Sequence, residues 1–243
     1  MAGALDTLRS LFVDGVKVVV ATPHLSASDP DGSRRRSVDE VWPRLVKQAR
    51  MTLPELELER GFEILLDTPE LDLSDGALRL GGSRFALVEF HAFTIPHNSA
   101  AALARISEAG FVPVLAHPER YSGYHRGFGV VEEWRSAGAL LQLNGGSLLG
   151  EYGETVKLIA NRFLTEGNID VIASDNHARP RRNLSLRRVW DFLAERGFEE
   201  QATLLLSENP QRILNDRMPR RIEAAGKQEG LLARLARTLR GDA

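Results

Sequence analysis

Short apolar runs alternate with longer segments that place apolar residues at helical spacing. Residues 4–15 show the helical spacing and stop at Gly15, which predicts a helix capped by that glycine. Residues 16–21 form a short β-branched run, which predicts a buried strand. The same two patterns predict further strands within 56–65 and over 84–90, 111–116, 139–144 and 169–174, and further helices over 37–51, 99–110, 130–137, 154–167, 184–196 and 199–206.

The helix over 37–51 carries its own start signal. Ser37 is followed three positions later by Glu40, which is the capping-box pattern. In that pattern the hydroxyl and the carboxylate accept hydrogen bonds from backbone N–H groups that the first helical turn leaves free. We therefore expect this helix to begin with Ser37 as its N-cap.

Six predicted strands separated by helices indicate an α/β fold with a parallel sheet, because helical crossovers join parallel neighbours. The near-continuous apolar strands fit burial on both faces of the sheet. A chain of 243 residues is long enough for one α/β barrel. In such a barrel the carboxyl ends of the strands meet on one face, where functional side chains gather.

Three of the six histidines follow apolar strands directly, in VVVATPH, PVLAHPERY and VIASDNH. These are His24, His117 and His177, and equivalent positions after three strands favour a shared site over three separate turn residues. Asp175 precedes His177 by two positions, so in an extended chain both side chains would point to one side and share a cation. Histidine and carboxylate ligands without cysteine suit Mn, Fe or Zn.

Two further charged residues have a functional interpretation and a structural one. Glu63 lies in the otherwise apolar stretch GFEIL, where a buried carboxylate needs a metal or an ion pair; the alternative is a side chain facing solvent. Arg120, in HPERY, could hold a phosphate oxyanion with its planar guanidinium. Its alternative role is an ion pair with Glu119 or another acid.

Composition narrows the functional classes. The formal net charge is −2, so no global basic field favours nucleic acid. The chain has no cysteine, which excludes disulfides, zinc–thiolate sites and a cysteine nucleophile. The first residues lack the pattern of a signal peptide, and no apolar run approaches the roughly 18 residues that span a bilayer, so we expect a cytoplasmic protein.

Over about residues 3–215 the sequence resembles the PHP-superfamily phosphatases, and most of all the bacterial manganese-dependent protein-tyrosine phosphatases of capsule and exopolysaccharide operons. The motifs that carry the resemblance are ATPH, GFEI, LVEF followed by IP, PVLAHPERY, SDNH followed by Arg, and ENPQRIL, in that order. The resemblance implies a distorted α/β barrel with parallel strands and a multinuclear metal centre, with Mn²⁺ expected and Fe or Zn as alternatives. It also implies hydrolysis of phosphotyrosine on a protein, typically the tail of a polysaccharide-assembly tyrosine kinase.

Carried over residue by residue, the resemblance implies a set of metal ligands in which Glu63 bridges two metals. The implied ligands are His24, Glu63, His117, Asp175 and His177. The implied catalytic residues that bind the substrate phosphate are Arg120 and Arg182.

The sequence departs from the family pattern in two places. Family members begin with a strand that carries Asp-x-His-x-His, whereas this sequence starts within the helix that follows it, so we expect the first barrel strand to be missing. A family histidine after LVEF corresponds to Phe93 or Thr94 here, and His91 is a candidate substitute. Three alternatives to a working tyrosine phosphatase with a late assigned start remain open: an enzyme with a reduced ligand set, an inactive relative that binds a phosphotyrosine tail or kinase as a regulator, and a sister activity such as histidinol-phosphate hydrolysis.

A change in composition near residue 216 predicts two parts, a phosphatase domain over 1–216 and a basic tail over 217–243. The tail places Leu231, Leu232, Leu235 and Leu239 on one helical face with arginines opposite. A solvated terminal helix is one interpretation of the pattern. Docking on a partner or on an anionic membrane surface is the other.

Overall fold

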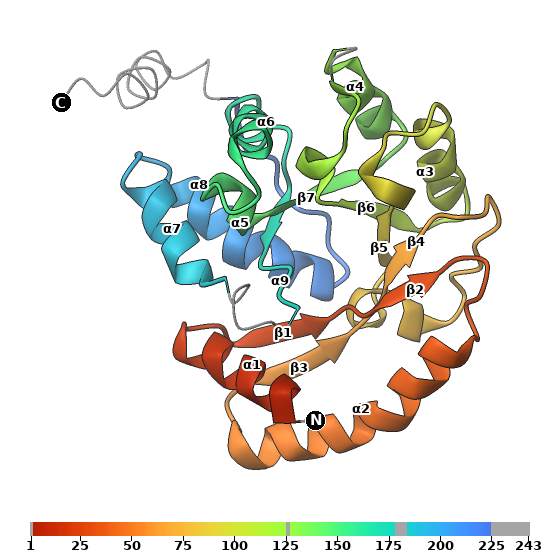
Figure 1. Cartoon of the computed structure of the whole chain (residues 1–243), viewed down its shortest axis with the longest axis vertical. Helices are drawn as coiled ribbons and strands as arrows, with labels where there is room; N and C mark the ends of the chain where they lie inside the picture. Colours follow the sequence, from red (N-terminus) through yellow and green to blue (C-terminus); the bar gives the residue numbers. More distant parts are fainter. Residues whose placement is uncertain (1, 125–126, 178–183, 225–243) are drawn as a thin grey trace.

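The structure is a computed structural model that describes residues 2–124, 127–177 and 184–224. Strands and helices alternate along the chain, and every pair of neighbouring strands is parallel (Figure 1). The strands are β1 (Val18–Ala21), β2 (His24–Ser26), β3 (Glu57–Arg60), β4 (Glu63–Leu65), β5 (Phe85–Glu89), β6 (Val112–Ala116), β7 (Leu140–Asn144) and β8 (Val171–Ala173). The helices are α1 (Ala2–Val13), α2 (Ser33–Thr52), α3 (Ser99–Glu108), α4 (Gly129–Ser136), α5 (Gly145–Leu148), α6 (Glu154–Thr165), α7 (Leu186–Ala194), α8 (Glu199–Thr203) and α9 (Asn209–Leu214).

The strands form a six-stranded sheet in the order β2-β4-β5-β6-β7-β8 and a two-stranded sheet, β1-β3. Figure 1 shows β1 and β3 grouped with α1 and α2, and the other helices arranged around the larger sheet. The predicted parallel α/β class is confirmed. Within the described part of the chain, the two sheets are open at β2, β8, β1 and β3 and do not close into a ring.

Helix α2 begins earlier than its capping signal predicts. It spans Ser33–Thr52 with Gly32 at the N-cap, so the prediction of Ser37 as N-cap is wrong. The additional turn is held by Arg35, a buried arginine whose guanidinium donates to Asp39 and to Asp75 at 2.7 Å each. Because Asp75 lies 40 positions away in the sequence, the local pattern contains no sign of this contact.

Three other parts of the fold differ from the sequence prediction. The predicted strand region 56–65 is divided into β3 and β4, and β2 was not predicted, because three residues are too few to show a period. The helix predicted over 199–206 continues as α8, a π-helical segment over Leu204–Glu208, and α9, which ends at Leu214. Pro210 lies in the first turn of α9, directly after the π-helical segment, where the Asn209 N–H donates to the carbonyl of Leu204 five positions back.

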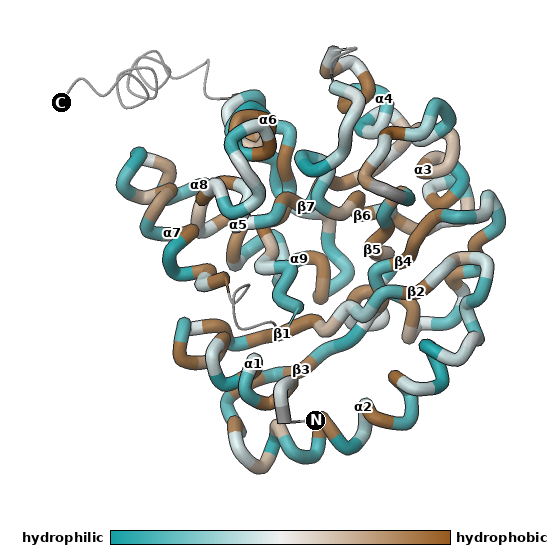
Figure 2. The backbone as a smooth tube through the Cα atoms, in the orientation of Figure 1, coloured by the Kyte–Doolittle hydropathy of each residue, from teal (hydrophilic) through white to brown (hydrophobic). Residues whose placement is uncertain are grey.

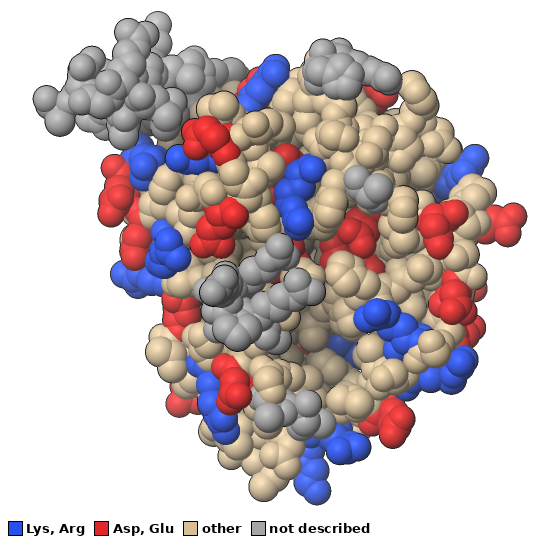
Figure 3. Space-filling view, in the orientation of Figure 1, with Lys and Arg blue, Asp and Glu red and all other residues tan. Residues whose placement is uncertain are grey.

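The core lies between the large sheet and its helices. Residues of β5, β6 and β7 are almost fully buried, and hydrophobic stretches concentrate along the strands in Figure 2. Acidic and basic side chains are interspersed on the face shown in Figure 3, as the small net charge leads one to expect. Among the described helices, none is both long and apolar enough to cross a membrane.

A buried ion pair links Arg135 of α4 to Asp170, the residue before β8, and it leads to a prediction about stability. Asp170 is 1% exposed, accepts a hydrogen bond from the backbone N–H of Leu141 at 2.7 Å and pairs with Arg135. We expect Asp170→Asn to lower the free energy of unfolding by about 3 kcal/mol, because it leaves a buried guanidinium without its counter-charge. The exposed pair of Arg162 and Glu166 provides the control, and Glu166→Gln should change stability by less than about 1 kcal/mol. Urea titrations of both variants measure this; equal effects would contradict it.

Candidate metal centre

Three side chains from the neighbouring strands β2, β4 and β5 lie close together. His24 and Glu63 are the first residues of β2 and β4 and pair with each other in the strand register, and Glu89 is the last residue of β5. One ligand atom of each lies within 4.8 Å of the others, which is a spacing that can hold a metal ion. The Nδ1 atom of His24 is 3.1 Å from Glu89 Oε1 and 3.3 Å from Glu63 Oε2.

His117 extends this group from the next strand. It follows β6 directly, is 3% exposed, and adopts a left-handed backbone conformation with φ of 36° at the start of the short helix η4 (Pro118–Arg120). Its Nε2 atom lies 2.8 Å from Glu63 Oε1 and 3.6 Å from Glu89 Oε2. Glu63 is 4% exposed and contacts both imidazoles, so its predicted alternative as a solvent-facing strand residue is wrong.

Asp175 and His177 reach the same group from the end of β8. The Nε2 atoms of His24 and His177 are 3.3 Å apart, and His177 Nδ1 lies 3.4 Å from Asp175 Oδ1. The expected geometry of an extended chain is wrong here, because Asp175 has a left-handed conformation with φ of 47°. A left-handed turn at Asp175, and not the alternation of side chains along a strand, brings the two side chains together. The structure therefore brings together all five predicted ligand residues, which are His24, Glu63, His117, Asp175 and His177. Together with Glu89 they form what we call the metal group.

Arg120 lies beside this group and is mostly buried. Its Nη1 atom is 3.2 Å from Asp175 Oδ2, and its guanidinium carbon lies 4.4 Å and 4.6 Å from the ring centroids of Phe93 and Tyr152. The alternative role predicted for Arg120, an ion pair with Glu119 or another acid, is therefore observed, with Asp175 as the acid in place of Glu119. Glu119 is fully buried and accepts hydrogen bonds from Ser147 Oγ at 2.6 Å and from the backbone of Asn144 at 3.1 Å.

The charges of the group act on its histidines. The hydrogen bond to Glu89 raises the pKa of His24, and the charges of Glu63, Glu89 and Asp175 act in the same direction against burial. Burial lowers the pKa of His117, but its hydrogen bond to Glu63 and that carboxylate's charge outweigh burial, so the net shift is upward. Carboxylates thus surround both imidazoles closely enough to favour a positive charge between them. The negative charge of these carboxylates, together with their oxygen donors and the imidazole nitrogens, fits a divalent metal ion.

Two residues of this region were not predicted from the sequence. Glu89 is the last residue of the apolar strand β5. A polar side chain at the carboxyl end of a strand is the same signal that identified the histidines, so the sequence could have indicated Glu89 as well. Asn144 ends β7 and donates from Nδ2 to Asp175 Oδ2 at 2.7 Å, which orients that carboxylate. Predicted Arg182 and the leucine face of the predicted tail lie outside the described residues. His91 is exposed and, among the described residues, is not part of the three-residue group.

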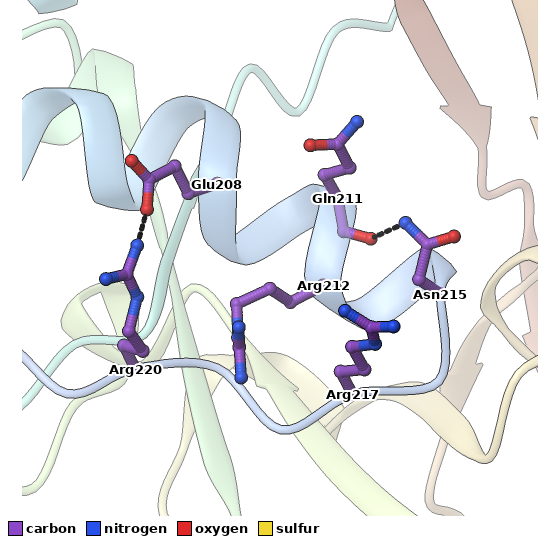
Figure 4. A pocket seen from close by; sticks show the side chains of 6 residues that line it. All are labelled: Glu208, Gln211, Arg212, Asn215, Arg217 and Arg220. Carbon is purple, nitrogen blue, oxygen red and sulfur yellow. Dashed lines mark hydrogen bonds and ion pairs between the residues drawn. The ribbon is translucent and has the colours of Figure 1, made fainter.

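A separate pocket lies at the other end of the sheet. It is lined by Glu208, Gln211, Arg212, Asn215, Arg217 and Arg220 (Figure 4). Arg220 pairs with Glu208, and Arg212 Nε donates to the carbonyl of Met218 at 2.7 Å. Asp216, next to this pocket in the sequence, accepts a hydrogen bond from the backbone N–H of Arg84, the residue before β5. Glu89 of the candidate metal centre is the last residue of β5, so the pocket and the metal centre lie at opposite ends of this strand. Of the predicted site residues that the structure describes, none lines this pocket.

The parallel fold and the imidazole–carboxylate group define the class: an α/β protein with a candidate metal centre at one end of its parallel strands. Within that class, the chain belongs to the capsular polysaccharide synthesis family CpsB/CapC, whose family model matches residues 1–215. The family resemblance predicted from the sequence is therefore confirmed.

Known relatives match most of the chain. The tyrosine-protein phosphatase YwqE of Bacillus subtilis (strain 168) is 25% identical over 221 residues, which cover 88% of this chain and 85% of the relative. The tyrosine-protein phosphatase CpsB of Streptococcus pneumoniae is 27% identical over 218 residues, covering 87% of this chain and 89% of the relative. A crystal structure from work on these two proteins, described as unique metal-dependent tyrosine phosphatases, matches with a TM-score of 0.75 and 25% identity over 92% of this chain and 90% of the other.

Proposed function

We propose that this protein is a metal-dependent phosphomonoester hydrolase that acts on phosphotyrosine in proteins. The observation that carries the proposal is the group of carboxylates and imidazoles with a guanidinium at its edge, where Arg120 lies 3.2 Å from Asp175. Metal ligands beside an arginine suit a phosphoryl group, whose oxygens need both Lewis-acid and hydrogen-bonding partners. The two phosphatase relatives and the metal-dependent structural match support the same reaction.

We assign the metal ligands to the residues that the structure brings together. They are His24, Glu63, Glu89, His117, Asp175 and His177. Mn²⁺ is the proposed ion, and this donor set also suits Fe or Zn. When bound, the metal stabilises negative charge on a phosphoryl oxygen and lowers the pKa of a water molecule. Asn144 keeps Asp175 oriented, because its amide donates to Oδ2.

Arg120 has the proposed role of binding the phosphate. A planar guanidinium donates two parallel hydrogen bonds to a phosphate, and its stacking on Phe93 and Tyr152 limits its rotation. Arg182 is proposed as a second phosphate ligand. The tyrosine phenolate has a pKa of about 10, so it leaves without strong help from an acid. The chain has no cysteine, which is consistent with a mechanism that needs no cysteine nucleophile.

The proposed substrate is the phosphorylated tail of a tyrosine kinase of polysaccharide assembly, in the cytoplasm. The family description, capsular polysaccharide synthesis, supports this process. The name of a Staphylococcus aureus relative, putative tyrosine-protein phosphatase CapC, 23% identical over 232 residues, supports the same substrate chemistry.

The test is phosphate release by the metal-supplemented chain from a phosphotyrosine peptide and from histidinol phosphate. We expect turnover of the peptide at a clearly higher kcat/KM, and loss of that turnover in Asp175→Asn, which keeps the shape of the side chain and removes its charge. Preference for histidinol phosphate would contradict the proposed substrate. Tight binding of the peptide without turnover would favour the alternative role as a phosphotyrosine-binding regulator.

A further inference from the structure

Phe93 places an exposed aromatic ring at the edge of the metal group. Its side chain belongs to the short helix η3 (His91–Phe93), and the residue is 40% exposed. The ring centroid lies 5.4 Å from that of His117 in an edge-to-face arrangement and 4.4 Å from the guanidinium carbon of Arg120. Binding sites commonly combine a few polar groups with an aromatic surface of this kind.

The backbone holds this ring in place at some cost. Phe93 has a φ of 49°, which is the left-handed region and uncommon for a bulky side chain. Its carbonyl accepts a hydrogen bond from the Ser122 N–H at 2.6 Å, and Ile95 N–H donates to the Ser122 carbonyl at 3.2 Å. Ser122 closely follows Arg120 in the chain. The segment that supplies the guanidinium therefore also fixes the position of the ring.

The rings of Phe93 and Tyr152 lie over the guanidinium plane of Arg120, and its N–H edge faces the carboxylate of Asp175. A phosphate held by the N–H edge of Arg120 carries its organic group one ester oxygen away. Phe93 is a partly exposed aromatic side chain close to that position, because its ring contacts both Arg120 and His117.

We propose that Phe93 is a specificity-determining residue that contacts the aromatic ring of an aryl phosphate. This inference rests on the proposed function, since it assumes that Arg120 and the metal group bind the phosphoryl group. Two aromatic rings in an offset or edge-to-face arrangement attract each other beyond their buried area, by enough for about a fivefold change in affinity. An alkyl phosphate offers no ring and gains little from this contact. The site would thereby favour phosphotyrosine over phosphoserine.

Phe93 also touches Arg120, so a ring contact must be separated from a positioning effect. A positioning effect acts on the phosphate and weakens aryl and alkyl ligands by the same factor. A ring contact acts on the aryl ligand alone. The ratio of the two affinities therefore distinguishes the two roles.

The experiment measures binding of phenylphosphonate and methylphosphonate to the metal-loaded full chain by isothermal titration calorimetry. The wild type should bind phenylphosphonate more tightly. Phe93→Leu, which keeps an apolar side chain without a ring, should weaken phenylphosphonate binding about fivefold and methylphosphonate binding less than about twofold. Phe93→Tyr should restore the wild-type ratio. The control is Met51→Ala, an exposed apolar residue at the end of α2, which should leave both affinities unchanged.

Each result has a defined meaning, with circular dichroism confirming that the variants are folded. Equal weakening of both phosphonates by Phe93→Leu would overturn the inference and reduce Phe93 to a positioning residue for Arg120. Unchanged affinities, or no binding of either phosphonate by the wild type, would also overturn it. The expected ratio in a chain that binds phosphonates but hydrolyses no phosphotyrosine would support the ring contact and reject the proposed function, so the two failures are distinguishable.

Discussion

Glu63→Gln is expected to lower kcat/KM for a phosphotyrosine peptide by about a thousandfold, more than the ~10–100-fold typical of losing an outer partner of a metal ligand. Glu63 contacts both His24 and His117, at 3.3 Å and 2.8 Å, and lies closer to His117 than Glu89 does at 3.6 Å. Glutamine keeps the size of the side chain but removes the charge that a metal ion needs. The variant should therefore also bind less metal, as measured by elemental analysis of the purified protein.

The control for this variant is a second buried glutamate of the same region. Glu119 is fully buried, but its Oε1 accepts from Ser147 and from the backbone of Asn144, so it does not belong to the group of three that can hold a metal. Glu119→Gln should keep the metal content of the wild type. Full metal content and full turnover in Glu63→Gln would show that the metal centre does not depend on this carboxylate.

Arg120→Lys is expected to lower kcat for the same peptide by about a hundredfold, in the range of removing one donor to the charge of a transition state. Lysine keeps the positive charge but cannot donate two parallel hydrogen bonds or stack between Phe93 and Tyr152. Metal content should stay unchanged, since a guanidinium is not a ligand. This result would separate phosphate binding from metal binding.

Arg162→Lys is the matched control, because Arg162 is half exposed and pairs with Glu166 on the surface of α6. It should retain wild-type kcat. Wild-type kcat in Arg120→Lys would mean that the charge alone suffices at this position. Loss of metal from the same variant would assign Arg120 to the integrity of the centre, through Asp175, and not to the substrate.

The sequence correctly predicted those strands and site residues whose signals lie within a few neighbouring positions of the chain. The apolar runs that became β5, β6 and β7 are strands that bury nearly every side chain, so their period and composition were clear. His24 and His117 were identified because they follow such runs, and carboxyl ends of parallel strands lie on one face. Glu63 was identified because a charge inside an apolar run needs a partner.

Features that depend on distant contacts were missed or predicted for the wrong reason. The start of α2 depends on Arg35, whose partner Asp75 lies far along the chain. Asp175 and His177 meet through a left-handed turn, which a strand pattern cannot indicate. Glu89 carries a signal that was visible in the sequence, but only the register of β4 and β5 places it beside Glu63's strand and His24.

The most direct measurement for the central claim is phosphate release from a phosphotyrosine peptide by one preparation of the chain, before and after removal of metal by a chelator and after addition of Mn²⁺. We expect turnover to disappear with the metal and to return with Mn²⁺ in the wild type but not in Glu63→Gln. Such a result would tie hydrolysis to the carboxylate–imidazole group. Turnover that persists in the metal-free chain, or that never appears when metal is bound, would contradict the account.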